Sequence, residues 1–364
     1  MIYLPLNPLK AIKNKRYTAI DFGHHSLKLV QCRAESDKIS LLNWEKKRLP
    51  PGIINSGRID NINIVRIAVS SLLRQLSVKT GDLLIAPAPG QEIVSRLEVP
   101  GPGKDVLQEE INEIIANRFN LSPEEVSRDH ILLNNSIHSE DGNEDKKAVL
   151  LIAMPRDVLS SYQQVFKNSS ISPSVANFQG LALNSLLTYQ GLLQETGMII
   201  NMGSSFTKII IASQDDYFRE HSIEPAGNHF TEQLLANEAA FARAEEKKVS
   251  FDQNSMSIHK FKFRELVEKL CSEINRLITV HEKKYPQNPI EKLHLTGGGF
   301  KLPGLKDELS DRIERDIQLI EPLKGIKVDV GEMMEEEREM QLKSKDTLSV
   351  ALGLVASEVL HNER

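Results

Sequence analysis

The feature that most restricts the fold of this chain is a strand–turn–strand pattern that occurs twice. Residues 20–30 read as a buried strand, a glycine turn and a second strand, and residues 199–211 repeat this order. The two stretches align without gaps, so that Gly203 falls on Gly23. Repetition of a whole α/β unit predicts two lobes of similar topology, with a cleft between two matching glycine turns.

A second correspondence supports the repeat. Residues 62–76 carry apolar side chains at helical spacing and precede a buried strand that ends in prolines and a glycine, over residues 82–90. In the second half, a long helical pattern over residues 263–283 precedes a strand that ends in three glycines, over residues 292–299. The repeated unit therefore extends beyond the two hairpins.

The stretches between the repeated parts predict an insert in each lobe. The glycines and prolines at 100–103 mark the first boundary. Beyond it, residues 106–119 form an amphipathic pattern, and Ser122 with Pro123 marks a second helix start. The predicted division is a first lobe over 16–100, completed by about 176–192; a small α/β insert over 101–175 that binds a partner; a second lobe over 193–226, completed by 290–364; and a helical insert over 227–289.

Length and composition exclude several classes of protein. A chain of 364 residues exceeds the size of about 250–300 residues at which single cores stop growing. The net charge of -5 argues against a nucleic-acid partner. Neither of the two cysteines, Cys32 and Cys271, sits in a CxxC motif or a Cys/His cluster, which argues against structural zinc. No apolar run approaches the roughly 20 residues of a membrane span.

The two glycine turns and the triple glycine are the candidate binding segments. A glycine turn between strands presents several backbone N–H groups in one concavity, which can hold phosphate oxygens. An acidic residue beside it, Asp21, would hold Mg²⁺ through water, because Mg²⁺ keeps most of its hydration shell. The candidate residues are Asp21, Gly23, Ser26 and Lys28 in the first turn, Gly203, Ser204, Ser205 and Thr207 in the second, and Gly297, Gly298 and Gly299 at the third site, where bare backbone would admit adenine or ribose.

Over nearly its whole length the sequence resembles the type IV pilus assembly PilM family, within the superfamily of actin, sugar kinases and heat-shock chaperones. The segment at 290–305, IEKLHLTGGGFKLPGL, is the most similar of all to its family counterpart. The other similar segments are AIDFGHHSLKLVQC, LPPGIINSGRIDN, PAPGQEIVSRLEVP, MIINMGSSFTKIIIA, AGNHFTEQLL, ARAEEKK and LSVALGLV. The resemblance implies an α/β, actin-like fold of two duplicated, ribonuclease H-like lobes.

The resemblance also implies ligands and partners. ATP with Mg²⁺ would fill the cleft, with Glu245 and Lys248 near the adenosine and Gly297 to Gly299 lining its pocket. The protein would be a cytoplasmic scaffold, peripheral to the inner membrane, that forms a homo-oligomer or ring. It would bind the N-terminal peptide of a PilN-type membrane protein on the first insert and its neighbouring lobe, and it would face the pilus motor ATPases.

Four positions depart from the family pattern. Asn201 stands where the family has an acidic residue, His24 and His25 replace small residues at the first turn, and Ala226 replaces a glycine. An amide cannot serve as a carboxylate base or hold a metal as firmly as a carboxylate. We therefore expect weak ATP hydrolysis at most. A site that has lost the binding of ATP and Mg²⁺ is the alternative.

Two alternatives remain. A type II secretion (GspL-like) cytoplasmic adaptor that has lost nucleotide binding would share this fold, although it ordinarily continues into a membrane span. A small-molecule kinase of the same superfamily would need a carboxylate base for a substrate hydroxyl. The candidates for such a base, Asp105 and Asp129, lie in the first insert, away from the glycine turns.

Overall fold

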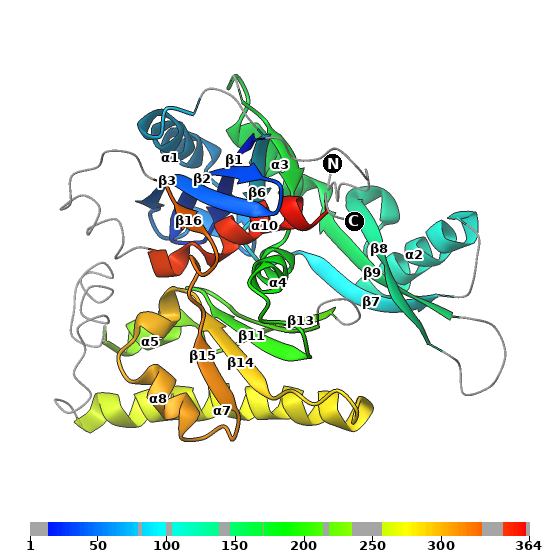
Figure 1. The fold of residues 1–364 in the computed structure, drawn as a ribbon, viewed down its shortest axis with the longest axis vertical. Coiled ribbons are helices and arrows are strands. Elements are labelled where there is room, and N and C mark those ends of the chain that lie inside the picture. Colours follow the sequence, from blue (N-terminus) through cyan, green and yellow to red (C-terminus); the bar gives the residue numbers. More distant parts are fainter. Residues whose placement is uncertain are drawn as a thin grey trace.

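The computed structural model describes residues 14–78, 82–99, 104–137, 146–169, 171–213, 218–234, 257–329 and 345–361. Two large sheets lie one above the other, and two helices run between them (Figure 1). A third, smaller sheet stands to one side of this pair (Figure 1). The two large sheets are the cores of two lobes, and the small sheet belongs to the first insert.

The first lobe is built on a six-stranded sheet in the order β10-β6-β1-β2-β3-β16. Its centre is the hairpin of β1 and β2, whose side chains are largely buried because the sheet is covered on both faces. The strands are β1 (Lys15–Phe22), β2 (Ser26–Glu35), β3 (Lys38–Arg48), β6 (Asp82–Ala86), β10 (Pro173–Ala176) and β16 (Lys327–Val328). A small hairpin of β4 (Ile54–Asn55) and β5 (Arg58–Ile59) follows β3.

Four helices cover this sheet. On its outer face lie α1 (Ile62–Gln75) and α3 (Arg156–Val165), and between the two large sheets lie α4 (Gln179–Tyr189) and α10 (Ser349–His361) (Figure 1). Helix α1 begins where the sequence predicts it, because the side chain of Asn61 caps it by accepting the N–H of Ile64 at 3.2 Å.

The second lobe repeats the arrangement on a five-stranded sheet in the order β13-β12-β11-β14-β15. Its hairpin of β11 and β12 pairs in parallel with β14, just as the hairpin of β1 and β2 pairs in parallel with β6. The elements are β11 (Gly197–Met202), β12 (Thr207–Ala212), β13 (Phe218–Ile223), β14 (Lys292–Thr296), β15 (Asp316–Leu319), α5 (Gly227–Leu234), α7 (Ser257–Lys284) and α8 (Leu305–Ser310).

Helix α7 belongs to the core of the second lobe. Its apolar face, including Val267, Leu270 and Ile274, packs with the strands of the second sheet in one buried cluster. This differs from the sequence-based division, which placed all of 227–289 in an insert, because the 28-residue helix covers the second sheet along its length (Figure 1). Within the described ranges, no helix is long and apolar enough to cross a membrane.

The first insert is a three-stranded antiparallel sheet, in the order β7-β9-β8, with one helix against it. The elements are β7 (Ile93–Val99), α2 (Lys104–Phe119), β8 (Val126–Ile137) and β9 (Lys146–Pro155). The helix predicted from Ser122 is wrong, because only one turn of 3₁₀ helix forms at Pro123–Glu125. The chain then pairs with β9 as β8, so strand pairing overrides the local helix-start signal.

Candidate functional site

The first glycine turn, between β1 and β2, brings a carboxylate and an ammonium group together. Asp21 and Lys28 are partners in the antiparallel register, and Lys28 Nζ lies 2.9 Å from Asp21 Oδ2. The other oxygen, Oδ1, accepts a hydrogen bond of 2.9 Å from Nε2 of Gln179, the first residue of α4. The turn closes through the N–H of Gly23, which donates to the carbonyl of Ser26 at 3.0 Å. The carboxylate of Asp21 is therefore held by two donors at the base of the turn.

The second glycine turn, between β11 and β12, closes in the same way. The N–H of Gly203 donates to the carbonyl of Phe206 at 3.0 Å. The amides that begin α5 hold this turn from behind: Gly227 donates to the carbonyl of Gly203 at 2.9 Å, and Asn228 donates to that of Ser204 at 2.8 Å. The carbonyls of Gly203 and Ser204 are therefore already hydrogen-bonded to the first turn of α5.

The two turns contact each other across the space between the lobes. The rings of His24 and Phe206 lie 5.7 Å apart, centroid to centroid, with their planes at 60°. Nearby, Nε2 of His25 lies 3.5 Å from Nδ2 of Asn228. The duplicated turns thus meet across the interlobe space, which is the geometry that the repeat predicts.

The three glycines after β14 differ in what a side chain at each position would contact. Gly297 has a φ of +99°, and a Cβ there would collide with Asn201 Oδ1 and the carbonyl of Met202. A Cβ at Gly299 would collide with the side chain of Met202. At Gly298 a Cβ would meet no atom within 4 Å. Packing against β11 therefore requires Gly297 and Gly299, and Gly298 alone borders open space.

All three glycine segments line one pocket between the lobes, with a volume of about 220 Å³. The first residues of α10 and of α4 complete its wall. The sequence-predicted residues that line it are Asp21, Gly23, Ser26, Lys28, Gly203, Ser204, Ser205, Gly297, Gly298 and Gly299. Residues far apart in the sequence thus converge on a single cavity.

Of the three remaining predicted residues, Thr207 is the one that the structure describes, and it does not line this pocket. Thr207 is buried, and its hydroxyl donates to the carbonyl of Pro225 at 2.6 Å, so it fixes the second turn from behind. Glu245 and Lys248 lie outside the described residues.

The pocket is strongly basic. Five cationic side chains line it, and Asp21 is the only carboxylate among the lining residues that the structure describes. The cations are Lys28, Lys46, Arg48, Lys208 and Lys301. Burial, together with the neighbouring charges of Lys28, Lys301 and Arg48, lowers the pKa of Lys46 to about 8. A polyanion in the pocket would relieve this mutual repulsion.

The polar lining residues that sequence reasoning missed include Gln179, Lys46, Arg48 and Lys301. Two of these lie on β3, where Lys46 is opposite Lys28 and Arg48 is opposite Ser26 in the register. Extending the register of the first hairpin to the third strand would have found both. Gln179 is brought in by the tertiary fold, and no local pattern marks it.

His24 lines the same pocket and has one unpartnered ring nitrogen among the described residues. Its side chain is only 6% exposed, and its Nε2 has no hydrogen-bond partner among the described residues. Burial, followed by the charge of His25, lowers the pKa of His24 to about 4, so the ring is neutral at pH 7. A neutral imidazole in the tautomer with a proton on Nε2 can donate one hydrogen bond to a ligand oxygen.

Comparisons with known proteins identify the family. The family model "Type IV pilus assembly protein PilM" matches residues 19–358, which is most of the chain. The chain belongs to the PilM family. The resemblance inferred from the sequence segments is thereby confirmed. No curated protein matched this sequence.

Solved structures give the fold of this PilM-family protein independent support. The PilM-PilN type IV pilus biogenesis complex matches with a TM-score of 0.78 and 19% identity, over 96% of this chain and 99% of that chain. The ethanolamine utilization protein EutJ from Carboxydothermus hydrogenoformans matches with a TM-score of 0.54 and 15% identity, over 96% and 91%. The nucleotide-free diol dehydratase-reactivating factor matches with a TM-score of 0.52 and 9% identity, over 95% and 100%. The predicted two-lobe, actin-like α/β fold is confirmed.

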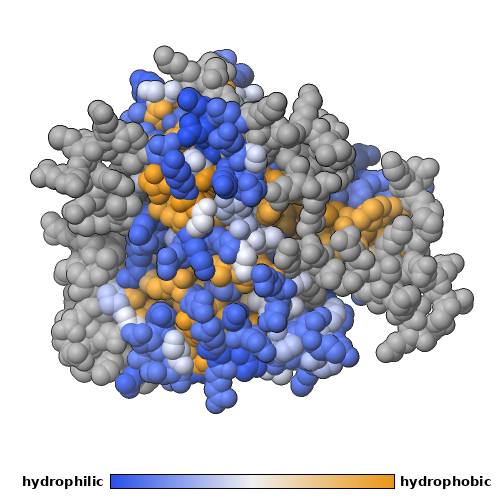
Figure 2. Space-filling model, in the orientation of Figure 1, coloured by the Kyte–Doolittle hydropathy of each residue, from blue (hydrophilic) through white to orange (hydrophobic). Residues whose placement is uncertain are grey.

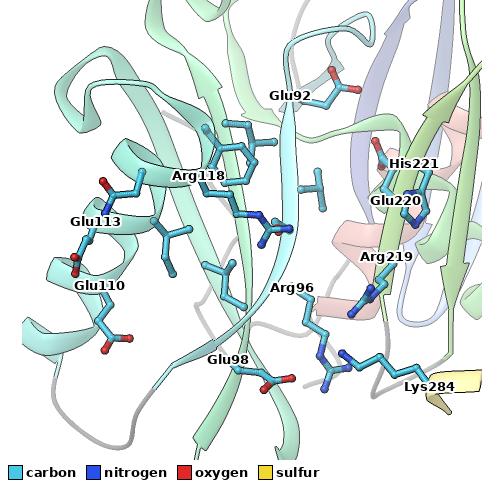
Figure 3. Close-up of a pocket in the computed structure, with 17 residues that line it drawn as sticks. Glu92, Arg96, Glu98, Glu110, Glu113, Arg118, Arg219, Glu220, His221 and Lys284 are labelled. Atoms are coloured by element: carbon cyan, nitrogen blue, oxygen red, sulfur yellow. The ribbon is translucent and has the colours of Figure 1, made fainter. Parts of the chain in front are cut away.

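The PilM-family chain has a second and larger cavity, a groove of about 860 Å³ between the first insert and the second lobe. Strands β7 and β13 flank it, helix α2 forms one wall, and the hollow is visible beside the insert in Figures 2 and 3. Apolar, cationic and acidic side chains share the lining, including Val94, Ile114, Phe119, Arg96, Arg219 and Glu98. We refer to this cavity as the insert groove.

Two sheet edges border the insert groove. Strand β7 ends the order of the insert sheet, and β13 ends the order of the second large sheet. Among the described residues, neither strand has a second hydrogen-bonded neighbour. Such edges expose backbone N–H and C=O groups that can pair with another chain.

Proposed function

We propose that this PilM-family protein is a nucleotide-binding scaffold of a type IV pilus assembly platform, with Mg-ATP in the pocket between its lobes. The convergence of two duplicated glycine turns and a triple glycine on one strongly basic cavity carries this proposal. Backbone amides and cations together are the donor set that phosphate groups require.

The residues present fit a magnesium nucleotide. Lys28, Lys46 and Arg48 supply cationic donors, and Gly298 leaves room for a flat group beside the backbone. Asp21 is suited to contact Mg²⁺ through water once Lys28 turns from its carboxylate to a phosphate. The metal would neutralise phosphate charge, while the protein side chains bind and orient the nucleotide.

We propose that hydrolysis is slow. Asn201 lines the pocket where the family has an acidic residue, and Asp21 is already engaged by Lys28 and Gln179. The described lining therefore contains no uncommitted carboxylate to serve as a general base. Asp129 lies on β8 of the insert and is not among the described lining residues of the pocket, which weighs against a small-molecule kinase.

Substitutions at Gly298 test the nucleotide site. A glutamate there would enter open space and place a carboxylate among the cations, whereas an alanine would meet no neighbour. We expect calorimetric titration with Mg-ATP to show binding to the wild type and to Gly298→Ala, and a loss of at least about tenfold in affinity for Gly298→Glu. Equal affinities for all three proteins would refute the site.

We further propose that the insert groove binds the N-terminal peptide of a PilN-type membrane protein. The support is the similarity of this chain to the PilM of a PilM-PilN complex, together with the two sheet edges that border the groove. An extended peptide would pair its backbone with β7 and place alternate side chains on the apolar wall of α2. Through such a partner the protein would sit in the cytoplasm, peripheral to the inner membrane.

Matched isoleucine substitutions test the peptide site. Ile114 lines the groove on α2, whereas Ile67 is 67% exposed on α1, away from the groove. In a fluorescence-polarisation titration with the N-terminal peptide of a PilN-type protein from the same organism, we expect Ile114→Asp to weaken binding by about tenfold or more, and Ile67→Asp to bind like the wild type. Weakening by both, or by neither, would contradict the proposal.

The same family resemblance leads us to propose a homo-oligomeric or ring-shaped assembly that faces the pilus motor ATPases. Mass measurement of the purified protein with and without the PilN-type peptide would test the oligomer. A monomer under both conditions would contradict it.

A further inference from the structure

The two halves of the repeat neutralise their matching lysines in different ways. Lys28 is opposite Asp21 in the register of the first hairpin and pairs with it at 2.9 Å. Lys208 is opposite Asn201 in the second hairpin, and an amide carries no charge to pair with it. Lys208 instead forms ion pairs with Glu92 and Glu220, the second at 2.5 Å.

The partners of Lys208 come from two separate parts of the molecule. Glu220 lies on β13 of the second lobe, next to β12, which carries Lys208. Glu92 lies directly before β7, where the chain enters the first insert, and its Oε2 accepts the N–H of Gly90 at 2.6 Å. The ion pair of Lys208 with Glu92 therefore ties the entrance of the insert to the second lobe.

These three side chains also form the wall between the two cavities. Lys208 lines the pocket between the lobes, whereas Glu92 and Glu220 line the insert groove. Figure 3 shows the two carboxylates close together at the upper end of the groove. A change in the ion pairs of Lys208 would therefore change the electrostatic potential in both cavities.

The cluster is held tightly and is short of positive charge. All three side chains are at most 6% exposed, so one ammonium group faces two carboxylates in a poorly solvated site. Burial raises the pKa of Glu220, while the two carboxylates raise the pKa of Lys208 against the effect of its burial. Oε2 of Glu220 has no partner among the described residues, and it lies against Gly180 at the start of α4.

We propose that Lys208 is an exchangeable counter-ion, which pairs either with Glu92 or with the phosphates of a nucleotide, so that nucleotide binding releases the insert from the second lobe. This inference rests on the proposed nucleotide site. The asparagine at 201 leaves Lys208 without a charged partner in its own hairpin, so its counter-ions are Glu92 and Glu220 on the side of the insert groove. Glu92 and the phosphates then compete for one cation, and removing the charge of Glu92 favours the phosphates.

The exchange predicts a variant with increased affinity. In a calorimetric titration with Mg-ATP, and in a second with inorganic tripolyphosphate, we expect Glu92→Gln to bind on the order of tenfold more tightly than the wild type. The matched control is Glu98→Gln, which removes the same charge from an exposed residue of β7 and is expected to change affinity by less than about twofold.

Hydrogen exchange at the insert entrance, residues 91–99, gives a second readout. We expect Mg-ATP to accelerate exchange there in the wild type, and Glu92→Gln to exchange faster from the outset with little further change. If the wild type binds ATP while Glu92→Gln binds no more tightly, or exchange in the wild type does not respond, the counter-ion exchange is wrong and the nucleotide site stands. If the wild type binds neither probe, the nucleotide site itself is wrong and the exchange fails with it.

Discussion

Replacing Lys46 by glutamine should make the protein more stable and a weaker nucleotide binder at the same time. Lys46 lies on β3 among Lys28, Arg48 and Lys301 with part of its surface open to solvent, and its pKa is lowered from 10.5 to about 8 by partial burial and by these charges. The folded protein therefore binds the proton of Lys46 less tightly than the unfolded chain does. Below pH 8 the lysine is charged in both states, so its full cost to folding is present at pH 7.

The structure sets the size of this effect. Because Lys46 is exposed by more than a third, solvent screening reduces what the pKa shift from 10.5 to about 8 costs, and we expect about 1 kcal/mol in the free energy of unfolding. Stability of the wild type should rise between pH 8 and about pH 10.5, because the unfolded chain holds this proton longer. Lys46→Gln should be more stable than the wild type at pH 7 by up to this amount and should lose the rise.

The binding of Mg-ATP should change in the opposite direction. Phosphates favour the charged form of Lys46, so binding takes up a proton above pH 8 and weakens by about tenfold between pH 7 and pH 9. The side chains that face Lys46 are Lys28, Arg48, Lys301 and Asp21. Lys46→Gln should bind about tenfold more weakly at pH 7 and should lose much of the pH dependence.

The neighbouring lysine is the control. Lys47 points to the other face of β3, where its Nζ lies 2.9 Å from the hydroxyl of Ser71. Denaturant unfolding and calorimetry of Lys47→Gln should match the wild type within about 0.5 kcal/mol. A Lys46→Gln protein that is less stable than the wild type, or that binds Mg-ATP equally well, would refute the electrostatic reasoning.

Three further substitutions test the stability of the fold. Burial raises the pKa of Glu358, on α10, to about 7, so the folded state binds this proton more tightly and loses stability as pH rises from 4.5 to 7. Glu358→Gln should therefore stabilise the protein by up to about 3 kcal/mol at pH 8 and by little at pH 4. Equal gains at both pH values in denaturant unfolding would contradict this. At the triple glycine, Gly297→Ala should cost at least about 1–3 kcal/mol because of its positive φ and its contacts with β11, whereas Gly298→Ala should cost under about 1 kcal/mol. Thermal unfolding of the two alanine variants decides this, and equal losses would show that β11 does not impose the difference.

The internal repeat in the sequence predicts much of the fold. Because β1 with β2 and β11 with β12 share one pattern, their pairing and the meeting of Gly23 with Gly203 follow from the sequence. The helix expected at Ser122 failed for a physical reason, since its local capping signal competes with the pairing of Val126–Ile137 to β9.

The electrostatics of the site depend on contacts that no local pattern shows. The position of Lys208 is visible in the repeat, but its partners Glu92 and Glu220 come from the insert entrance and from β13. Gln179 reaches Asp21 across 158 positions of sequence. Such contacts exist only once the lobes are packed together, so sequence spacing alone cannot supply them.

The most direct test of the pocket between the lobes is a crystal structure of the protein grown with Mg²⁺ and a non-hydrolysable ATP analogue. We predict that its phosphates lie within hydrogen-bond distance of Lys46 and of amides in both glycine turns, 23–26 and 203–205. Well-ordered density for the analogue at any other place, with these turns touching no phosphate, would contradict the account.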